Sequence, residues 1–585
     1  MKMTEQETWN LKDLFKGKTE EEIFNKSLNL KQQIIQKKPD LEKEPTPELI
    51  LDIIKLNEEL ELELSRILSY YSLRMHTNVK DEEAKAKLDY YKQAASDIDN
   101  ETMFFDLWFI QLEEQQIKEY INNPLLEKYS QHLKNLIKVK PYTKTEEIEQ
   151  ILNIKNITGR HAFSNLFDVL TSSFKFEIQG QELTQEELVS KFSDPNPKIR
   201  EEAYTALLNI YKKNSTTISE IYKNIVLDWN NENQKIRKYE NAIAPRNTSN
   251  GLTNEVVQTM IKVIRENVEL IQEFFKLKKE YLEKKDQHHA YSRMHIYAPY
   301  NLTKEYAYEE SKKICLETYK EFDAEFYEHA KKIFDEKHVH SHPKKNKRSG
   351  AFCYGPNNET TPYVLLNHTN KIKDLFTMMH ELGHGIHDIY ASNNTNILYD
   401  AVLPLAETAS ILGETILSKK LLQTNNKEEK ISLIMYLMEH YYATIIRQNY
   451  FIIFEEEAHK RIMDGVTKTE LDNYYYDLLK EQFGDMEIPE LFKHEWNYLP
   501  HIHHAPFYCY AYSWGNLLVL ALYAEYEKNS EFKEKIKDIL KAGGSKDTLK
   551  ILEEANIDPT KKEFWESGFK IIKEQLEEFK ELTKN

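Results

Sequence analysis

Two histidines and a glutamate stand at a spacing that suits a catalytic metal. The segment TMMHELGHGIHD (377–388) contains His380, Glu381 and His384. On an α-helix, residues four apart share a face and are separated by about 6 Å along the axis, so both imidazoles can bind one zinc ion. Glu381 can then accept a proton from a water on the metal as that water attacks a carbonyl carbon. The pattern predicts one zinc per chain, with Glu381 as the general base.

A helix must carry these residues, and the apolar pattern predicts one. Apolar side chains recur at helical spacing from Ile372 to Ile389. His387 shares the polar face, but seven residues from His380 it lies about 10 Å away along the axis. Because ligand bonds are about 2 Å long, we expect His387 to pack against or support the ligands rather than bind the metal.

A third protein ligand is needed to leave one open position on a catalytic zinc. Glu407 lies one turn into a helix that Pro404 is predicted to start. Ile411 falls between Glu407 and Glu414 on one helix face, a mixture typical of a protein interior. The acidic candidates just downstream of the histidine pair are Asp388, Asp400, Glu407 and Glu414.

The rest of the chain reads as mostly helical. Of 585 residues only 15 are Gly and 17 Pro, and helical periods with charged faces dominate, as over 48–73. Strands are predicted only as a hairpin around Phe176 and as the segments 350–355 and 362–367. The turn-rich segment 193–197 suggests an N-terminal helical domain at 1–193 and a catalytic domain at 194–585.

Charge and composition exclude several classes of protein. With 79 basic and 96 acidic residues the net charge is −17, which leaves no basic footprint for nucleic acid. It keeps the protein soluble or makes an acidic cleft for cationic substrates, and composition leaves both open. Three scattered cysteines indicate neither a disulfide framework nor a thiolate zinc site. Without a signal-like or membrane-spanning run, a cytoplasmic protein with no membrane partner is expected.

Motifs along nearly the whole chain resemble the oligoendopeptidase F branch of the thimet oligopeptidase-like zinc peptidases. The resemblance is strongest in HELGHGIH, in LAETAS, which begins 21 residues after His384, and in PHIHHAPFYCYAYSWG. It implies a mainly α fold of two helical halves flanking a deep substrate channel, with a small β-sheet beside the HExxH helix. It also implies short unstructured peptides as substrates. Weaker matches are TWNLKDLF, SSFKFEI, KRSGAFCYG, TPYVLLNHT and IIRQNYFIIFE.

The same resemblance implies roles for particular residues. Glu407 matches the third zinc ligand of the family, and His501 and Tyr512 match the histidine and tyrosine that act on the substrate in the transition state. A tyrosine hydroxyl suits this role because it can donate to a developing oxyanion. Substrate-binding roles are predicted for His504, Tyr508 and Tyr510, although an aromatic core helix explains the two tyrosines equally well.

Two segments before the metal motif leave alternatives open. If 362–367 forms an edge strand, an extended peptide can pair with it, whereas a buried central strand cannot take one. Gly355 is predicted to bind substrate by letting a mobile loop close. His338, His340 and His342 precede the basic run 344–348, so a solvated loop is favoured over a second metal site.

The leading function is an endopeptidase acting on short peptides, as a monomer or a simple homo-oligomer. The nearest alternative is a metallo-carboxypeptidase or dipeptidyl carboxypeptidase on the same scaffold. That activity needs a fixed cation for a C-terminal carboxylate, and Arg447 is the residue placed to supply it. A non-catalytic peptide-binding protein is a further alternative, but it would have no need of the base Glu381.

Overall fold

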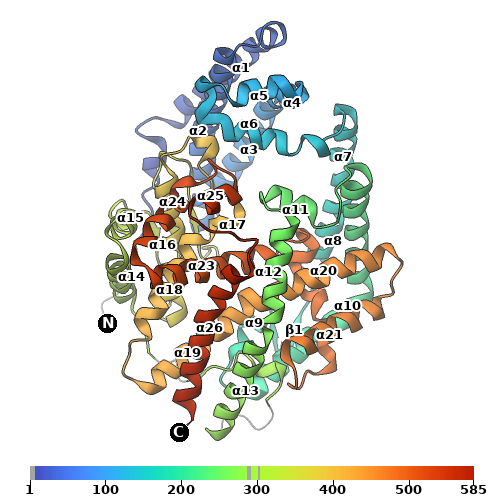
Figure 1. Ribbon diagram of the computed structural model, residues 1–585, viewed down its shortest axis with the longest axis vertical. Helices are drawn as coiled ribbons and strands as arrows, with labels where there is room; N and C mark the ends of the chain where they lie inside the picture. The colour runs from blue at the N-terminus through green and yellow to red at the C-terminus, as the bar shows by residue number, and fades with distance from the viewer. Residues whose placement is uncertain (1–6, 286–290, 301–303, 585) are drawn as a thin grey trace. The chain divides into compact units, whose positions relative to one another are not determined.

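The computed structural model describes residues 7–285, 291–300 and 304–584 and is mainly helical, as predicted (Figure 1). In these ranges the strands form one two-stranded and one three-stranded sheet. The chain divides into two compact units, each built from three segments. The first comprises Met1–Pro141, Lys304–Lys420 and Asn529–Asn556, and the second comprises Tyr142–Thr303, Leu421–Lys528 and Ile557–Asn585.

The predicted boundary at residue 193 lies inside one of the segments of the second unit. It therefore does not separate the two compact units, which are assembled from stretches far apart in the sequence. A turn-rich stretch marks only where a local element ends, so it cannot reveal such interleaving. The division into 1–193 and 194–585 stays a prediction.

The first unit is a helical assembly with a small sheet. Its helices are α1 (Glu20–Lys43), α2 (Pro47–Thr77), α3 (Glu82–Thr102), α4 (Phe104–Gln111), α5 (Glu114–Ile121), α6 (Ser130–Lys138), α14 (Tyr308–Phe322), α15 (Ala324–Asp335), α16 (Ile372–Ala391), α17 (Leu403–Ala406), α18 (Thr408–Leu421), α24 (Lys533–Ala542) and α25 (Thr548–Glu554). Its strands are β3 (Val339–His340), β4 (Phe352–Tyr354) and β5 (Tyr363–Leu365).

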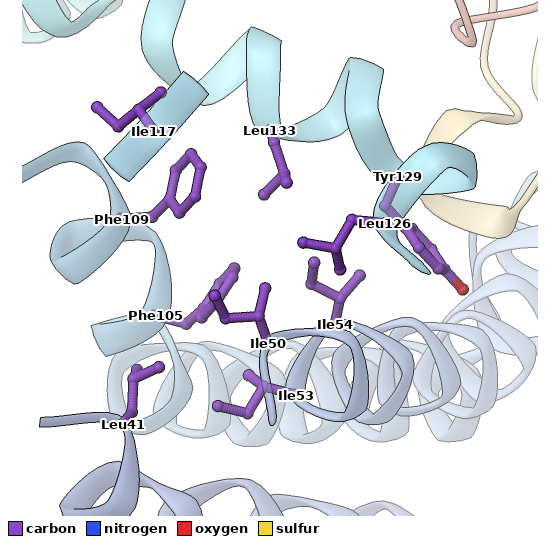
Figure 2. Close-up of a cluster of buried hydrophobic side chains, with 10 residues drawn as sticks. All are labelled: Leu41, Ile50, Ile53, Ile54, Phe105, Phe109, Ile117, Leu126, Tyr129 and Leu133. Atoms are coloured by element: carbon purple, nitrogen blue, oxygen red, sulfur yellow. The ribbon is translucent and has the colours of Figure 1, made fainter. Parts of the chain in front are cut away.

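One hydrophobic cluster joins the N-terminal helices of this unit (Figure 2). Ile50, Ile53 and Ile54 come from one face of α2, as the 3–4 spacing predicts. They meet Phe105 and Phe109 from α4, whose rings fill the space between the helices. The remaining members come from α1, α5, α6 and the segment between α5 and α6, and they are Leu41, Ile117, Leu126, Tyr129 and Leu133.

The three-stranded sheet has the order β3-β5-β4. β5 pairs in parallel with β3 and antiparallel with β4, and its three residues are fully buried. The hypothesis that 362–367 forms an edge strand is therefore wrong, because both sides of β5 are already paired. The edge strand beside α16 is β4.

Two of the three histidines before the basic run are interior residues. His338 and His340 are 1% and 3% exposed, and His340 belongs to β3. His338 stacks on the Tyr363 ring and contacts the carbonyl oxygen of Thr361 through Nδ1 at 2.8 Å. The expectation of a solvated loop is wrong here, because β5 recruits this short segment as a strand.

The motif at the start of the chain packs against this sheet. The indole N–H of Trp9 donates to the Val364 carbonyl oxygen at 2.9 Å, and the Tyr363 hydroxyl donates to the Asn10 carbonyl oxygen at 3.0 Å. Leu14 is fully buried between Tyr363 and Leu73 of α2. These contacts show that the TWNLKDLF motif packs against the sheet beside α16, although it lies far from the metal motif in sequence.

The second unit contains the remaining helices and the predicted hairpin, β1 (Phe176–Ile178) with β2 (Gln181–Leu183). None of the helices in the described ranges has the length and apolar character needed to cross a bilayer. The helices of this unit are α7 (Glu146–Thr158), α8 (Arg160–Ser172), α9 (Gln185–Ser190), α10 (Pro197–Asn230), α11 (Ala244–Ser249), α12 (Asn254–Glu266), α13 (Val268–Lys284), α19 (Lys427–Tyr441), α20 (Arg447–Met463), α21 (Lys468–Phe483), α22 (Pro500–His504), α23 (Tyr510–Lys528) and α26 (Lys562–Thr583).

Candidate active site

Helix α16 carries the histidine pair and lies unusually close to its neighbours. A Cβ added at Gly383 would come within 2.4 Å of the Cα of Ser410 in α18. A Cβ at Gly385 would come within 2.5 Å of Ile333 Cδ1 in α15. Since any larger residue at 383 would force the helices apart, this glycine lets the start of α18 reach the face of α16 that bears the histidines.

Glu407 lies at a break between two helices. α17 ends at Ala406 and α18 begins at Thr408, so the helix started by Pro404 is a single turn. The Ser410 hydroxyl donates to Glu407 Oε2 at 2.7 Å and to the Glu407 carbonyl oxygen at 3.0 Å. These bonds hold the carboxylate at the end of α18 that faces α16.

Three potential ligand atoms converge at this point. His380 Nε2 and His384 Nε2 are 3.1 Å apart, and they lie 3.4 and 3.3 Å from Glu407 Oε2. Ligands at tetrahedral corners, with bonds of about 2.0–2.1 Å to zinc, are separated by about 3.3 Å, so the donor set fits zinc. In the described part of the chain, this is the one group of three metal-binding side chains with ligand atoms so close together.

Glu414 orients one of the two imidazoles. His380 Nδ1 lies 2.6 Å from Glu414 Oε1, so Nδ1–H donates to the carboxylate and the Nε2 lone pair points toward the ligand triangle. Burial alone would lower the pKa of His380, but the Glu414 carboxylate, helped by Glu407 and Glu381, raises it to about 9. The surrounding carboxylates thus stabilise a positive charge at His380, either a proton on the imidazole or a metal ion bound to it. The sequence pattern places Glu414 among the acidic ligand candidates, but it gives no sign of this supporting role.

Glu381 lies beside the histidines and is only 8% exposed. Burial raises the pKa of its carboxyl group, while the two neighbouring histidines act in the opposite direction. The backbone of Cys353, in the edge strand β4, lowers this pKa slightly, as the histidines do. Glu381 is thus a buried carboxyl group next to the histidine pair, and its raised pKa suits a general base.

A buried polar contact explains Gly355. A Cβ there would lie 2.4 Å from Asp388 Oδ2 and 2.5 Å from the Tyr399 hydroxyl. Burial raises the pKa of Asp388 to about 7, and the Tyr399 hydroxyl bonds to this carboxyl group. Gly355 is thus needed for close packing against Asp388, which lies one turn beyond His384. Its predicted role in substrate binding stays a prediction. His387 is 3% exposed and bonded to the Ala406 backbone, as expected of a residue that packs.

The predicted substrate residues cluster within the second unit. The Tyr512 hydroxyl lies 3.4 Å from His501 Nε2, and the Tyr508 ring is parallel to the His501 ring at 6.1 Å. Tyr508 and Tyr512 meet edge to face at 5.4 Å. All three side chains are partly exposed, so the segment presents two phenols and an imidazole together.

Two other predicted substrate residues differ from this cluster. Tyr510 is fully buried, and its hydroxyl accepts a bond from Asn250 Nδ2 at 2.6 Å. It is a core residue, because the first turn of α23 points its side chain inward, and the prediction that it binds substrate is corrected here. His504 is exposed and contacts Asp168 Oδ1 through Nε2 at 2.9 Å. Its role in substrate binding stays a prediction.

Two polar side chains hold the peptide group between Pro506 and Phe507, just before Tyr508. Arg246 donates to the Pro506 carbonyl oxygen at 3.3 and 3.2 Å, and the Phe507 N–H donates to Glu455 Oε1 at 3.0 Å. Phe507 has φ +58, a conformation that non-glycine residues rarely adopt. Arg246 and Glu455 thus stabilise a strained turn that sets the direction of Tyr508. No local pattern in the sequence signals this, because the two partners are about 260 and 52 residues away.

Known proteins share both the sequence and the fold. Peptidase family M3 matches residues 191–571, and the family described as Oligopeptidase F matches residues 108–176. The chain is 29% identical over 601 residues to an oligoendopeptidase F homolog of Borreliella burgdorferi, covering 99% of both chains. It is 27% identical over 605 residues to oligopeptidase PepF of Bacillus subtilis, covering 99% of this chain and 87% of that one.

Solved structures agree at the level of the fold. A putative peptidase from Chlamydophila abortus superimposes with a TM-score of 0.84 at 23% identity, over 92% of this chain and 91% of that one. Oligoendopeptidase-F from Enterococcus faecium superimposes with a TM-score of 0.70 at 21% identity, over 96% of this chain and 99% of that one. With the family match across most of the chain and a histidine–histidine–glutamate group able to hold a metal, this chain belongs to peptidase family M3 and is a metallo-oligopeptidase.

Proposed function

We propose that this peptidase is a zinc metalloendopeptidase that cleaves internal bonds of short, unstructured oligopeptides. The observation that carries the proposal is the triangle of His380 Nε2, His384 Nε2 and Glu407 Oε2, with sides of 3.1–3.4 Å. Two neutral donors and one carboxylate are the ligand set of many catalytic zinc sites, which keep a fourth position for water or substrate.

When bound, zinc supplies Lewis-acid polarisation of the scissile carbonyl and makes a water acidic enough to react near neutral pH. Glu381 takes the proton of the attacking water and passes it to the leaving amide nitrogen as the carbon–nitrogen bond breaks. Its raised pKa and its low exposure support this role. Glu414 holds the Nδ1 proton of His380, so that Nε2 stays free as a ligand.

We assign the oxyanion to the segment of the second unit that carries His501 and Tyr512. A phenol can donate a hydrogen bond without bringing a charge into the site. Because that bond is stronger to a developing oxyanion than to a neutral carbonyl oxygen, it stabilises the transition state more than the ground state. The contact between Tyr512 and His501 supports the assignment, because the imidazole restrains the phenol in one orientation. Tyr508 packs against both rings and is assigned to substrate binding.

The proposal includes peptide substrates, no nucleic-acid or membrane partner, and a cytoplasmic monomer or simple homo-oligomer. The net charge of −17 supports the exclusion of nucleic acid. Stably folded proteins should resist cleavage, because opening them costs several kcal/mol or more. Light scattering during size-exclusion chromatography gives the oligomeric state. A mass of more than a few chains would contradict that part of the proposal.

A peptide digest tests the central proposal. The purified chain is analysed for metal, then incubated with a mixed pool of peptides of roughly 5–20 residues, and the products are mapped by mass. We expect one zinc per chain, internal cuts, and loss of cutting with a chelator that zinc restores. Trimming confined to C-termini would favour the carboxypeptidase alternative. Intact peptides, or no stoichiometric divalent metal even after zinc addition, would refute the proposal.

A further inference from the structure

Two arginines in the second unit share one carboxylate. Arg293 Nη2 lies 3.2 Å from Glu495 Oε1, and Arg447 Nη2 lies 3.0 Å from the same oxygen. The other oxygen, Oε2, accepts a bond from the Tyr475 hydroxyl at 3.0 Å. Glu495 is 3% exposed, so the pairing takes place in the interior.

The charges of this group do not balance. Among the described residues, no second carboxylate is paired with either guanidinium. The neighbouring polar groups are the phenols of Tyr297, Tyr442 and Tyr475, and burial raises the pKa of each, so they stay neutral near pH 7. Two cations and one anion leave one uncompensated positive charge. Such a charge is costly in a protein interior unless an anion binds or water reaches it.

Arg447 is the accessible end of this group. Arg293 is 1% exposed and is covered by the rings of Phe483 and Phe492, at 5.1 and 5.0 Å. By contrast, 20% of the Arg447 side chain is exposed, although its Nε is buried and has no hydrogen-bond partner among the described residues. A ligand that neutralises the excess charge must therefore meet Arg447.

Arg447 also lies beside the segment that we assign to the substrate. The Ser513 hydroxyl, next to Tyr512, donates to the carbonyl oxygen of Ile445, two residues before Arg447, at 2.8 Å. The positive charge of Arg447 opposes the rise that burial causes in the pKa of Tyr498, a partly exposed residue just before α22. The excess charge thus faces the surface that presents His501 and Tyr512.

We propose that Arg447 binds a carboxylate of the peptide substrate, either the C-terminal group or an Asp or Glu side chain. The inference rests on the proposed function and adds a substrate preference to it. A guanidinium suits this task because its donors match the two oxygens of a carboxylate, and Glu495 holds the group in place. Binding at the exposed part of the guanidinium would neutralise the charge that Glu495 leaves uncompensated.

Matched peptides test the proposal. One internally cleaved peptide is prepared in three forms: with a free C-terminus, with a C-terminal amide, and with the free C-terminus but every Asp and Glu replaced by Asn and Gln. We expect the form that lacks the recognised carboxylate to lose about tenfold in kcat/KM, mostly through a higher KM. The amide form reports on the C-terminal group and the third form reports on acidic side chains.

Two substitutions assign the effect to Arg447. Arg447→Gln should abolish the preference, and Arg447→Lys should retain part of it, because the charge remains but the planar fork is lost. Arg237→Gln is the matched control. Arg237 belongs to the same unit, has a similarly exposed side chain (18%), and is paired with the two carboxylates of Glu149 and Glu232, so its positive charge is more than compensated. It should leave the preference unchanged.

The outcomes are distinct. Equal kcat/KM for all three peptides in the parent protein would overturn the inference even if neither Arg447 variant folds, and would leave the endopeptidase proposal standing. A preference that persists in Arg447→Gln would also overturn it, since a purely structural arginine affects all three peptides alike. Failure to cut any of the three forms would instead contradict the proposed function.

Discussion

Glu414 Oε1 lies 2.6 Å from His380 Nδ1, on the side of the imidazole opposite the ligand triangle. The two residues are 34 positions apart and come from different helices, α16 and α18. A carboxylate in this position fixes the tautomer and the ring orientation of a metal-binding histidine and makes the histidine more basic.

Replacing Glu414 by Gln should therefore weaken metal binding by about 10–100-fold while the fold is retained. The measurement is a competition titration of zinc against a chelator of known affinity. Glu321→Gln is a suitable control, because Glu321 is an exposed partner of Lys420 in the same unit. Unchanged zinc affinity in Glu414→Gln would show that the contact does not support the ligand.

Glu381→Gln should separate chemistry from metal binding. The substitution keeps the shape of the side chain but removes the base, so turnover should fall by at least about a hundredfold. Zinc content, measured on the same preparation, should stay at one per chain. Turnover within a few-fold of the parent would exclude Glu381 as the base.

Glu407→Ala, unlike Glu381→Gln, should change metal binding. Loss of a ligand should lower zinc content and activity together, and added zinc should restore activity only partly. Elemental analysis and peptide turnover are measured across a range of zinc concentrations. If Glu407→Ala keeps stoichiometric zinc at the parent's affinity, another group must be the third ligand.

The three tyrosines should behave differently. Tyr512→Phe should lower kcat by about 10²–10³ with little change in KM or zinc content, since only a donor to the developing oxyanion is lost. Tyr510→Phe should leave kcat near the parent value and reduce stability, because it removes the buried bond with Asn250. A large kcat loss in Tyr508→Phe with none in Tyr512→Phe would move the oxyanion role to Tyr508.

Glu455 should make stability depend on pH. Burial raises the pKa of this fully buried carboxyl from 4.5 to about 8, although the Phe507 N–H and the charge of Arg246 oppose the shift. Between these values the folded protein keeps a proton that the unfolded chain has lost, so the contribution of Glu455 to stability falls as the pH rises. Glu455→Gln should remove this loss and be increasingly more stable than the parent from pH 5 to pH 8.

Urea unfolding of both proteins at several pH values measures this difference. Glu457→Gln serves as the control, because Glu457 lies on the same helix but is partly exposed and paired with Arg461 at 2.8 Å. A difference between Glu455→Gln and the parent that stays constant with pH would show that Glu455 is ionised in the folded state across this range.

The sequence by itself determined the local features of this protein. Helix α16, its two histidines on one face and the hairpin β1–β2 follow from the spacing of apolar residues and from turn residues, and the structure confirms them. These features depend on hydrogen bonds and side-chain contacts between residues a few positions apart. They are therefore visible in any short window of sequence.

Only the tertiary structure decided which distant residues meet. The sequence pattern puts Glu407 and Glu414 on one helix face. In the structure, however, α18 packs against α16 at Gly383, so that Glu407 lies with both histidines and Glu414 lies behind one of them. Likewise, β5 is central because β3 joins its far side, and Arg447 carries unbalanced charge because Arg293 reaches the same carboxylate. Each outcome depends on packing between segments far apart in the chain, and local periodicity carries no information about such packing.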